Sequence, residues 1–166
     1  MADDETVSMP EGWDGYVLVL DEDQMPVWMG LTESCSYMWE MSYGSNCYSI
    51  MDVGVAADGS VLVAGGFQKD ITFASTDLGM QLELTGEGVG QHMFVGRFTE
   101  AGVPDWAVQA GGGATCFARA VAEGADKGIF VGGSFGKNAV FGAGEPGETE
   151  LSTSGGFDIF LAKYMP

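Results

Sequence analysis

The chain contains an internal repeat, which limits the folds open to it more than any other feature. Tyr16, Phe94 and Phe160 each occur in a short apolar run, 78 and then 66 positions apart. Trp28 and Trp106 are also 78 positions apart, so a second element recurs with the first. Recurrence at a nearly fixed spacing is typical of folds that stack similar supersecondary units. We therefore expect stacked units and not one irregular core.

Each unit is predicted to consist of β-hairpins. Apolar segments alternate with turn signals such as Asp58-Gly59, a dipeptide that strongly favours a hairpin turn between two apolar runs. Glycine accounts for 27 of the 166 residues without a three-residue period, which excludes collagen and favours a turn-rich β protein. The predicted fold class is all-β and antiparallel. The expected strands are residues 13–20, 26–29, 49–56, 60–67, 92–98, 103–108, 117–123, 129–135 and 157–164, with shorter segments around Phe73, Leu84, Phe141 and Leu151.

The repeat boundaries define the domain organisation. Residues 1–12 are an acidic lead-in, and residues 13–166 form a single domain with repeats at about 13–90 and 91–156. A third repeat begins at residues 157–166. Hydrophobic residues make up 46% of the chain, so a chain of this length can bury a core as one domain.

The charge balance argues against several partners. Six basic residues against 24 acidic ones give a net charge of −18, which repels the phosphates of nucleic acids and anionic lipids. No apolar run approaches the roughly 18 residues of a membrane-spanning helix. We therefore expect no nucleic-acid partner and no membrane insertion. The acidic excess is suited to a solubilising surface, and we expect an extracellular or cell-surface location, although no secretion signal is present in the numbered chain.

Residues 31–46 interrupt the first unit and have no counterpart in the second. Insertions in repeat folds fall in loops, often on the binding face. Tyr37, Trp39 and Tyr43 could form a contact patch for a glycan or protein ligand. They could equally pack as a lid on the neighbouring unit.

The three cysteines leave two interpretations open. Cys35 and Cys47 lie in the same irregular segment and could form a disulfide, which leaves Cys116 free, buried or paired between chains. All three could instead be reduced.

Motifs that carry chemistry are weak in this chain. Residues 132–136 match the Gly-x-Ser-x-Gly pattern of a nucleophile elbow, but no helix is expected after them and His92 is the only histidine. We therefore predict no enzyme and no catalytic residue. Asp21, Glu22 and Asp23 offer oxygen ligands for calcium without the order of an EF-hand loop. A solvated turn is the preferred interpretation there, with calcium as the alternative, and no other cofactor is predicted.

Residues 58–67 and 157–164 resemble the SBBP-type β-propeller repeats of bacteria. In those repeats an Asp-x-Phe-Val-Ala-Lys-Tyr strand, a return strand with Trp, an Asp-Gly turn and a Val-x-Val-x-Gly-x-Phe strand recur in order. The resemblance covers nearly all of residues 13–164. It is weaker at Val19 and Leu20, which replace the Lys and Tyr of the motif. It implies four-stranded antiparallel blades around a central axis.

The strand count of these expected blades does not close a ring. One blade is complete at residues 49–56, 60–67, 92–98 and 103–108, with two strands before it and three after it. A closed propeller needs about four to eight blades. In the repeat order a Trp-bearing return strand should follow residues 157–164, and residues 26–31 of another copy are a candidate. The predicted assembly edge consists of Phe157, Ile159, Phe160, Leu161 and Tyr164, with Val27 and Trp28 as the complementary residues.

The sequence therefore predicts a non-enzymatic structural or adhesion protein at the cell surface. Its propeller-type blades would assemble into a homo-oligomer, as a ring or as a filament. The alternatives are a lectin-like module that binds a ligand or glycan, and a piece of a longer propeller.

Overall fold

The computed structural model describes residues 15–24, 26–33, 50–75, 79–86, 90–113 and 115–165. Regular structure in these ranges is β-strand, and none of it is a helix long and apolar enough to cross a membrane. The strands are β1 (Gly15–Leu20), β2 (Pro26–Glu33), β3 (Ile50–Val55), β4 (Val61–Phe67), β5 (Asp70–Ser75), β6 (Gln81–Thr85), β7 (His92–Phe98), β8 (Pro104–Gly112), β9 (Thr115–Glu123), β10 (Ile129–Phe141) and β11 (Thr149–Tyr164).

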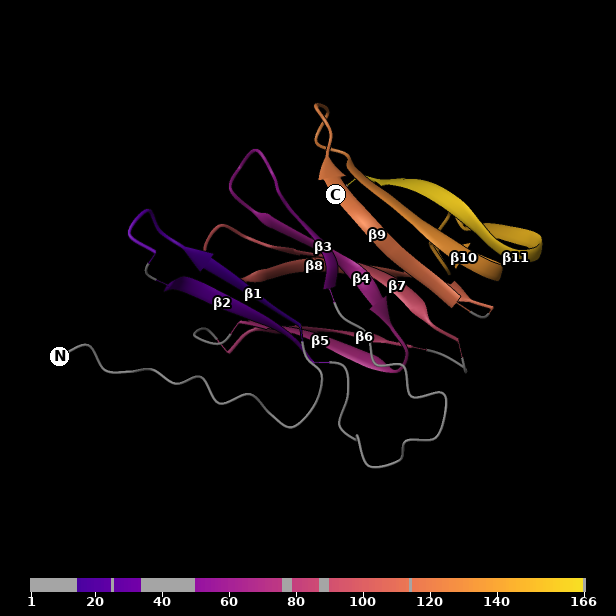
Figure 1. The fold of residues 1–166 in the computed structure, drawn as a ribbon, viewed down its shortest axis with the longest axis horizontal. Helices are drawn as coiled ribbons and strands as arrows, with labels where there is room; N and C mark the ends of the chain where they lie inside the picture. The colour runs from indigo at the N-terminus through magenta and orange to yellow at the C-terminus, as the bar shows by residue number, and fades with distance from the viewer. Residues whose placement is uncertain are drawn as a thin grey trace.

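The strands form two sheets (Figure 1). A four-stranded sheet has the order β1-β2-β5-β6, and a seven-stranded sheet has the order β11-β10-β8-β7-β4-β3, with β9 paired to β10. Every pair of named strands is antiparallel. The prediction of an all-β antiparallel fold is therefore confirmed.

Strands β3, β4, β7 and β8 are consecutive neighbours in the larger sheet. They correspond to residues 49–56, 60–67, 92–98 and 103–108, the four segments that the sequence groups into one unit. The Asp58-Gly59 turn joins the first two strands, and Gly59 adopts a positive φ of 82°, a backbone conformation that favours glycine. The turn chemistry thus sets the pairing of this hairpin.

The repeat is visible in the strand registers. Strand β4 pairs with β7 from Val61↔Phe98 onward, and β10 pairs with β11 from Ile129↔Tyr164 onward. Positions in β4 and β10 are 68 apart, whereas positions in β7 and the second half of β11 are 66 apart. Residues 157–164 of β11 therefore occupy the same place beside β10 that β7 occupies beside β4.

One feature of the topology was not predicted, namely that the units share a continuous sheet. Strand β10 continues past a register shift between Gly136 and Asn138, and its second half pairs with residues 110–112 of β8. Lys137 absorbs the change of direction with a φ of 60°. The same contact occurs earlier between β2 and β5, where Thr32↔Phe73 corresponds to Ala110↔Phe141.

Two apolar cores lie on opposite faces of β4 and β7. Because side chains alternate along a strand, Phe94 and Phe98 point to the core shared with the four-stranded sheet, whereas Met93 and Val95 point to the core shared with β9, β10 and β11. The Asp52 carboxylate also accepts a hydrogen bond from the Val121 N–H (2.8 Å), which ties β3 to β9. Strands β4 and β7 therefore form a central layer buried on both faces.

Gly66 and Gly133, the second residues of the Gly65-Gly66 and Gly132-Gly133 pairs, allow close approach between neighbouring strands. A Cβ at Gly66 would lie 2.5 Å from Cδ1 of Phe117, and one at Gly133 would lie 1.9 Å from the Phe117 carbonyl oxygen and 2.6 Å from the Phe160 ring. Both glycines therefore leave room for an aromatic ring on a neighbouring strand.

Candidate functional site

The most exposed apolar side chains of β11 occupy positions that are fully buried one unit earlier. Ile159 and Leu161 are 87% and 75% exposed, whereas their equivalents in β7, Met93 and Val95, are 0% exposed. Phe130 in β10 is 36% exposed, and its equivalent Leu62 in β4 is 0% exposed. The sequence pattern is the same in both units, and only the covering layer differs.

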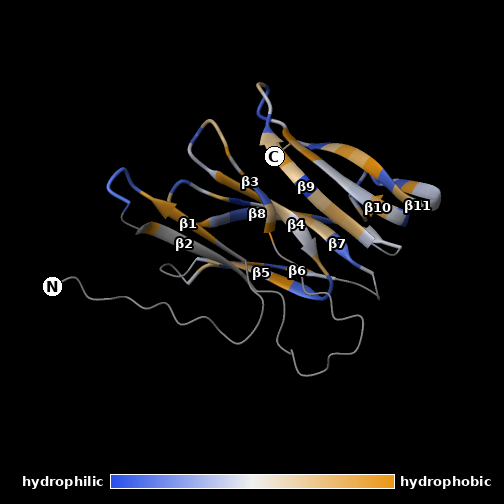
Figure 2. Cartoon of the chain, in the orientation of Figure 1, coloured by the Kyte–Doolittle hydropathy of each residue, from blue (hydrophilic) through white to orange (hydrophobic). Residues whose placement is uncertain are grey.

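We call this surface the outer face and define it as Phe130, Phe157, Ile159 and Leu161. Phe157 is 65% exposed. Figure 2 shows apolar segments of β11 at the outer side of the molecule. In the preceding unit the corresponding face is covered by β9 and β10, whose Cys116, Ala118 and Ile129 belong to the same core as Met93 and Val95. Exposed apolar residues gathered in this way are candidates for an interaction site.

An ion pair flanks the outer face. Lys163 contacts the Asp126 carboxylate, and its Nζ lies 5.2 Å from the centroid of the Phe130 ring. The hydrogen bond from Lys163 holds the pKa of Asp126 below its usual value, assisted by the Gly128 N–H. Asp58 and Arg97 form the same pair one unit earlier. In both units the ion pair joins the hairpin turn to the strand beside it.

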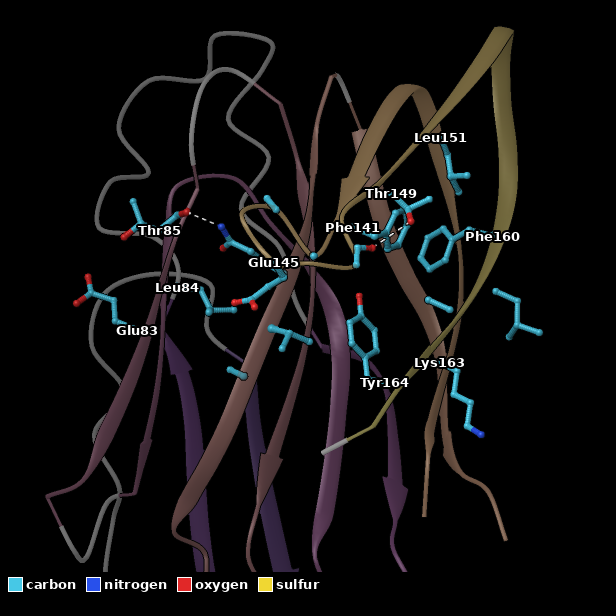
Figure 3. A pocket seen from close by; sticks show the side chains of 18 residues that line it. Glu83, Leu84, Thr85, Phe141, Glu145, Thr149, Leu151, Phe160, Lys163 and Tyr164 are labelled. Carbon is cyan, nitrogen blue, oxygen red and sulfur yellow. Dashed lines mark hydrogen bonds between the residues drawn. The ribbon is translucent and has the colours of Figure 1, made fainter. Parts of the chain in front are cut away.

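A second feature is a groove of about 990 Å³ on the other side of β11 (Figure 3). Its walls include residues 83–85 of β6, 107–109 of β8 and 160–164 of β11, with the turn that follows Phe141 closing one end. A groove over the face of a sheet would touch every second residue of a strand. Because the residues here are consecutive, the groove runs along strand edges.

The edges that line the groove are unpaired within the described residues. Strands β11 and β6 end their respective sheets, and β8 pairs with β10 only at residues 110–112. Figure 3 shows Phe141, Phe160 and Tyr164 on the β11 side and Leu84 on the β6 side. The groove therefore combines apolar side chains with the charged Glu83, Glu145 and Lys163, and its strand edges expose backbone hydrogen-bonding groups.

Two polar atoms of the groove lack a hydrogen-bond partner among the described residues. They are Gln109 Oε1 and Tyr164 Oη, both buried. Gln109 Nε2 donates to the Thr85 carbonyl (2.9 Å), which fixes the side chain beside β6. Burial raises the pKa of Tyr164 to about 12, with a smaller contribution from Cys116, so this hydroxyl is a neutral donor and acceptor at physiological pH. Buried polar groups normally have partners, so these two atoms suit a ligand with its own donors and acceptors.

The predicted assembly-edge residues divide between the two surfaces. Phe157, Ile159 and Leu161 lie on the outer face, whereas Phe160 is buried with its ring edge against Phe141 (centroids 4.9 Å apart) and Tyr164 lines the groove. This division follows from the alternation of side chains along β11.

The complementary residues lie in β2. Val27 is exposed, and Trp28 pairs with Val19 of β1 through the backbone, but its side chain is outside the described part of the chain.

The predicted ligand-contact and disulfide residues lie outside the described part of the chain, whereas Cys116 lies within it. Tyr37, Trp39, Tyr43, Cys35 and Cys47 all lie outside the described residues. Cys116 is a buried free thiol, and its burial raises its pKa to about 12.

The acidic turn and the serine motif lie in ordinary backbone settings. The Asp21 carboxylate accepts a hydrogen bond from the Asp23 N–H (3.0 Å), and no group of three or more His, Cys, Asp or Glu among the described residues is placed to hold a metal ion. Ser134 lies within β10, paired with Phe117 and Ile159, and its Oγ accepts a hydrogen bond from Arg119 Nε (3.2 Å). A nucleophile elbow needs a strand-to-helix turn, and Ser134 occupies a strand.

Sequence reasoning missed the groove, because it is lined by four separate segments of the chain, within residues 83–85, 107–109, 141–151 and 160–164. Comparison with protein families, with curated proteins and with solved structures gives no match.

Proposed function

We propose that this chain is a non-enzymatic structural or adhesion protein of the cell surface whose propeller-type blades self-assemble into a ring or a filament. The observation that carries the proposal is the outer face. Ile159 and Leu161 are exposed at positions where Met93 and Val95 are fully buried by the next unit. A second copy that presents a similar layer would bury them in the same way.

The propeller-type arrangement is supported by the strand order β3-β4-β7-β8 and by the packing of β9 and β10 against β4 and β7. The contact proposed between copies repeats this packing. It joins two different surfaces, namely the outer face of one copy and the surface of the next copy that lies at the end opposite to its own outer face. A head-to-tail contact of this kind closes into a ring or continues as a filament. The acidic surface supports the extracellular part of the proposal.

The proposal is tested by size-exclusion chromatography with light scattering. We expect species larger than the 17.4 kDa monomer, and we expect Phe157→Glu/Ile159→Glu, at two outer-face residues that do not line the groove, to shift them toward the monomer. Full burial of each side chain contributes about 1.5–3 kcal/mol to the free energy of association. Losing both contributions should therefore weaken association by several orders of magnitude.

A matched control separates this effect from a general effect of charge. Ala101 is exposed in the turn between β7 and β8 and lies outside the outer face and the groove. Ala101→Glu should leave the distribution of species unchanged. A monomer at every concentration of the unmodified chain would contradict self-assembly and favour the alternative in which further repeats of a longer polypeptide cover the outer face.

A further inference from the structure

We propose that the groove along β11 is a strand-binding slot, and that its occupant is β2 of a second copy of this chain. The inference rests on the proposed function and deepens it, because it names the segment that one copy gives to another. The slot lies along the free edge of β11 and shares Leu161 with the outer face, whereas Phe157 and Ile159 belong to the outer face and do not line the slot. Their roles can therefore be tested separately.

The internal repeat shows what belongs beside residues 160–164. In the preceding unit the equivalent edge of β7 is covered by β8, with Phe94 opposite Gln109 and Gly96 opposite Ala107. Beside β11 that place is the groove, and no described residue pairs with this edge. The missing element is therefore an extended strand antiparallel to β11.

Strand β2 has the register that this edge requires. It pairs with β1 as β8 pairs with β7, since Leu18↔Met29 corresponds to Gly96↔Ala107. Strands β1, β7 and the end of β11 are equivalent positions of the repeat. If β11 of one copy takes the place of β1 in another, Ala162 lies opposite Met29 and Phe160 lies opposite Leu31. In that copy β1 must first leave β2, so one strand of the repeat is replaced by an equivalent strand of another copy, in a manner similar to domain swapping.

The chemistry of the groove fits such a strand. Directly opposed residues of an antiparallel pair share one face, so Met29 and Leu31 would join Phe160 and Ala162 on the apolar wall. The backbone of the inserted strand would also carry N–H donors for Gln109 Oε1 and acceptors for Tyr164 Oη, the two buried groove atoms without partners. Addition of an extended segment to an exposed strand edge is a recurrent mode of recognition.

The slot is tested with a fluorescent peptide of residues 24–33 and the full chain, by fluorescence anisotropy. We expect saturable binding, and we expect the same peptide with Met29→Asp and Leu31→Asp to bind at least about tenfold more weakly, because two apolar side chains are lost. Ala162→Arg in the chain should weaken binding of the unmodified peptide, since Ala162 lines the groove. Ile159→Glu on the outer face should leave it unchanged. Equal binding of both peptides, or no binding, would overturn the slot.

The identity of the donor copy is tested by disulfide trapping. In a background of Cys35→Ser, Cys47→Ser and Cys116→Ala, one chain carries Ala162→Cys and a second carries Met29→Cys. Mild oxidation of the mixture should give the mixed dimer in larger amount than a mixture in which the second chain carries Leu31→Cys, which is out of register.

The outcomes of the two experiments separate the two proposals. Peptide binding without a register-specific disulfide would overturn a second copy as the occupant. A chain that assembles through the outer face but neither binds peptide nor forms the disulfide would overturn this inference and leave the proposed function intact. If the cysteine-substituted chains fail to fold by circular dichroism, the peptide experiment on the unmodified chain decides.

Discussion

Gly96 of β7 lies beneath the ring of Phe73, and a side chain there should be poorly tolerated. A Cβ at Gly96 would lie 2.6 Å from Phe73 Cε1 and 3.0 Å from Cδ1. The ring cannot move aside freely, because Phe73 is fully buried with its edge toward Phe94 (5.4 Å) and with Phe98 at 6.3 Å. Overpacking of a core costs about 1–3 kcal/mol. This cost exceeds the roughly 0.5–1 kcal/mol that alanine gains over glycine inside a strand.

We therefore expect Gly96→Ala to lower the free energy of unfolding, by up to about 2 kcal/mol once the alanine gain is subtracted. The assay is urea unfolding at low protein concentration, where the midpoint should fall and the slope should stay constant. In a Phe73→Leu background the same substitution should cost less, because the smaller side chain leaves room for the new methyl group. Ala162 occupies the equivalent position in β11, and Ala162→Gly is the matched control, for which no relief of strain is expected. An unchanged or higher midpoint for Gly96→Ala would refute the reasoning.

Three further predictions concern charge and the thiol. Raising the salt concentration from about 0.05 M to 0.5 M should strengthen self-association in light scattering, because a net charge of −18 makes copies repel one another at low salt; weaker association at high salt would contradict an apolar contact. Asp126 has a lowered pKa in the folded state, so its contribution to stability is present above its ordinary value of 3.8 and is lost as the pH falls through the lower folded value. The stability difference between the unmodified chain and Asp126→Asn should therefore shrink on acidification, and a constant difference down to the lowest measurable pH would exclude this origin. The Cys116 thiol, with its pKa raised to about 12, should react with a thiol reagent at pH 8 only after urea is added, measured by absorbance in a Cys35→Ser/Cys47→Ser background; fast reaction of the folded chain would show that the thiol is accessible.

The local signals in the sequence were sufficient for the strands β3, β4, β7 and β8 and for their grouping into one unit. The Asp58-Gly59 turn joins β3 to β4, and the spacing of Trp28 and Trp106 matches the equivalence of β2 and β8. These signals depend only on neighbouring residues and on backbone conformation, so they can be read without knowledge of the fold.

The shared sheet and the groove could not be read in this way. Joining β8 to β10 depends on a bend at Lys137, a residue type that gives no signal for a positive φ. The groove depends on three strand edges that meet only after folding. The division of residues 157–164 into an outer face and a groove wall was open to prediction from the alternation along a strand, because Phe160 and Ile159 must point to opposite sides.

The burial of β4 and β7 on both faces has a consequence for cooperativity. Each layer obtains part of its stability from the interface with its neighbour, so the stability of a stack is approximately a sum of layer terms and interface terms. The layer of β9, β10 and β11 lacks one stabilising interface as long as no neighbouring layer covers its outer face. Each added copy would supply this interface to the layer before it and would present its own uncovered outer face to the next copy. In a filament, assembly of this kind would have a direction along the stack, and the terminal layers would be its most easily unfolded parts.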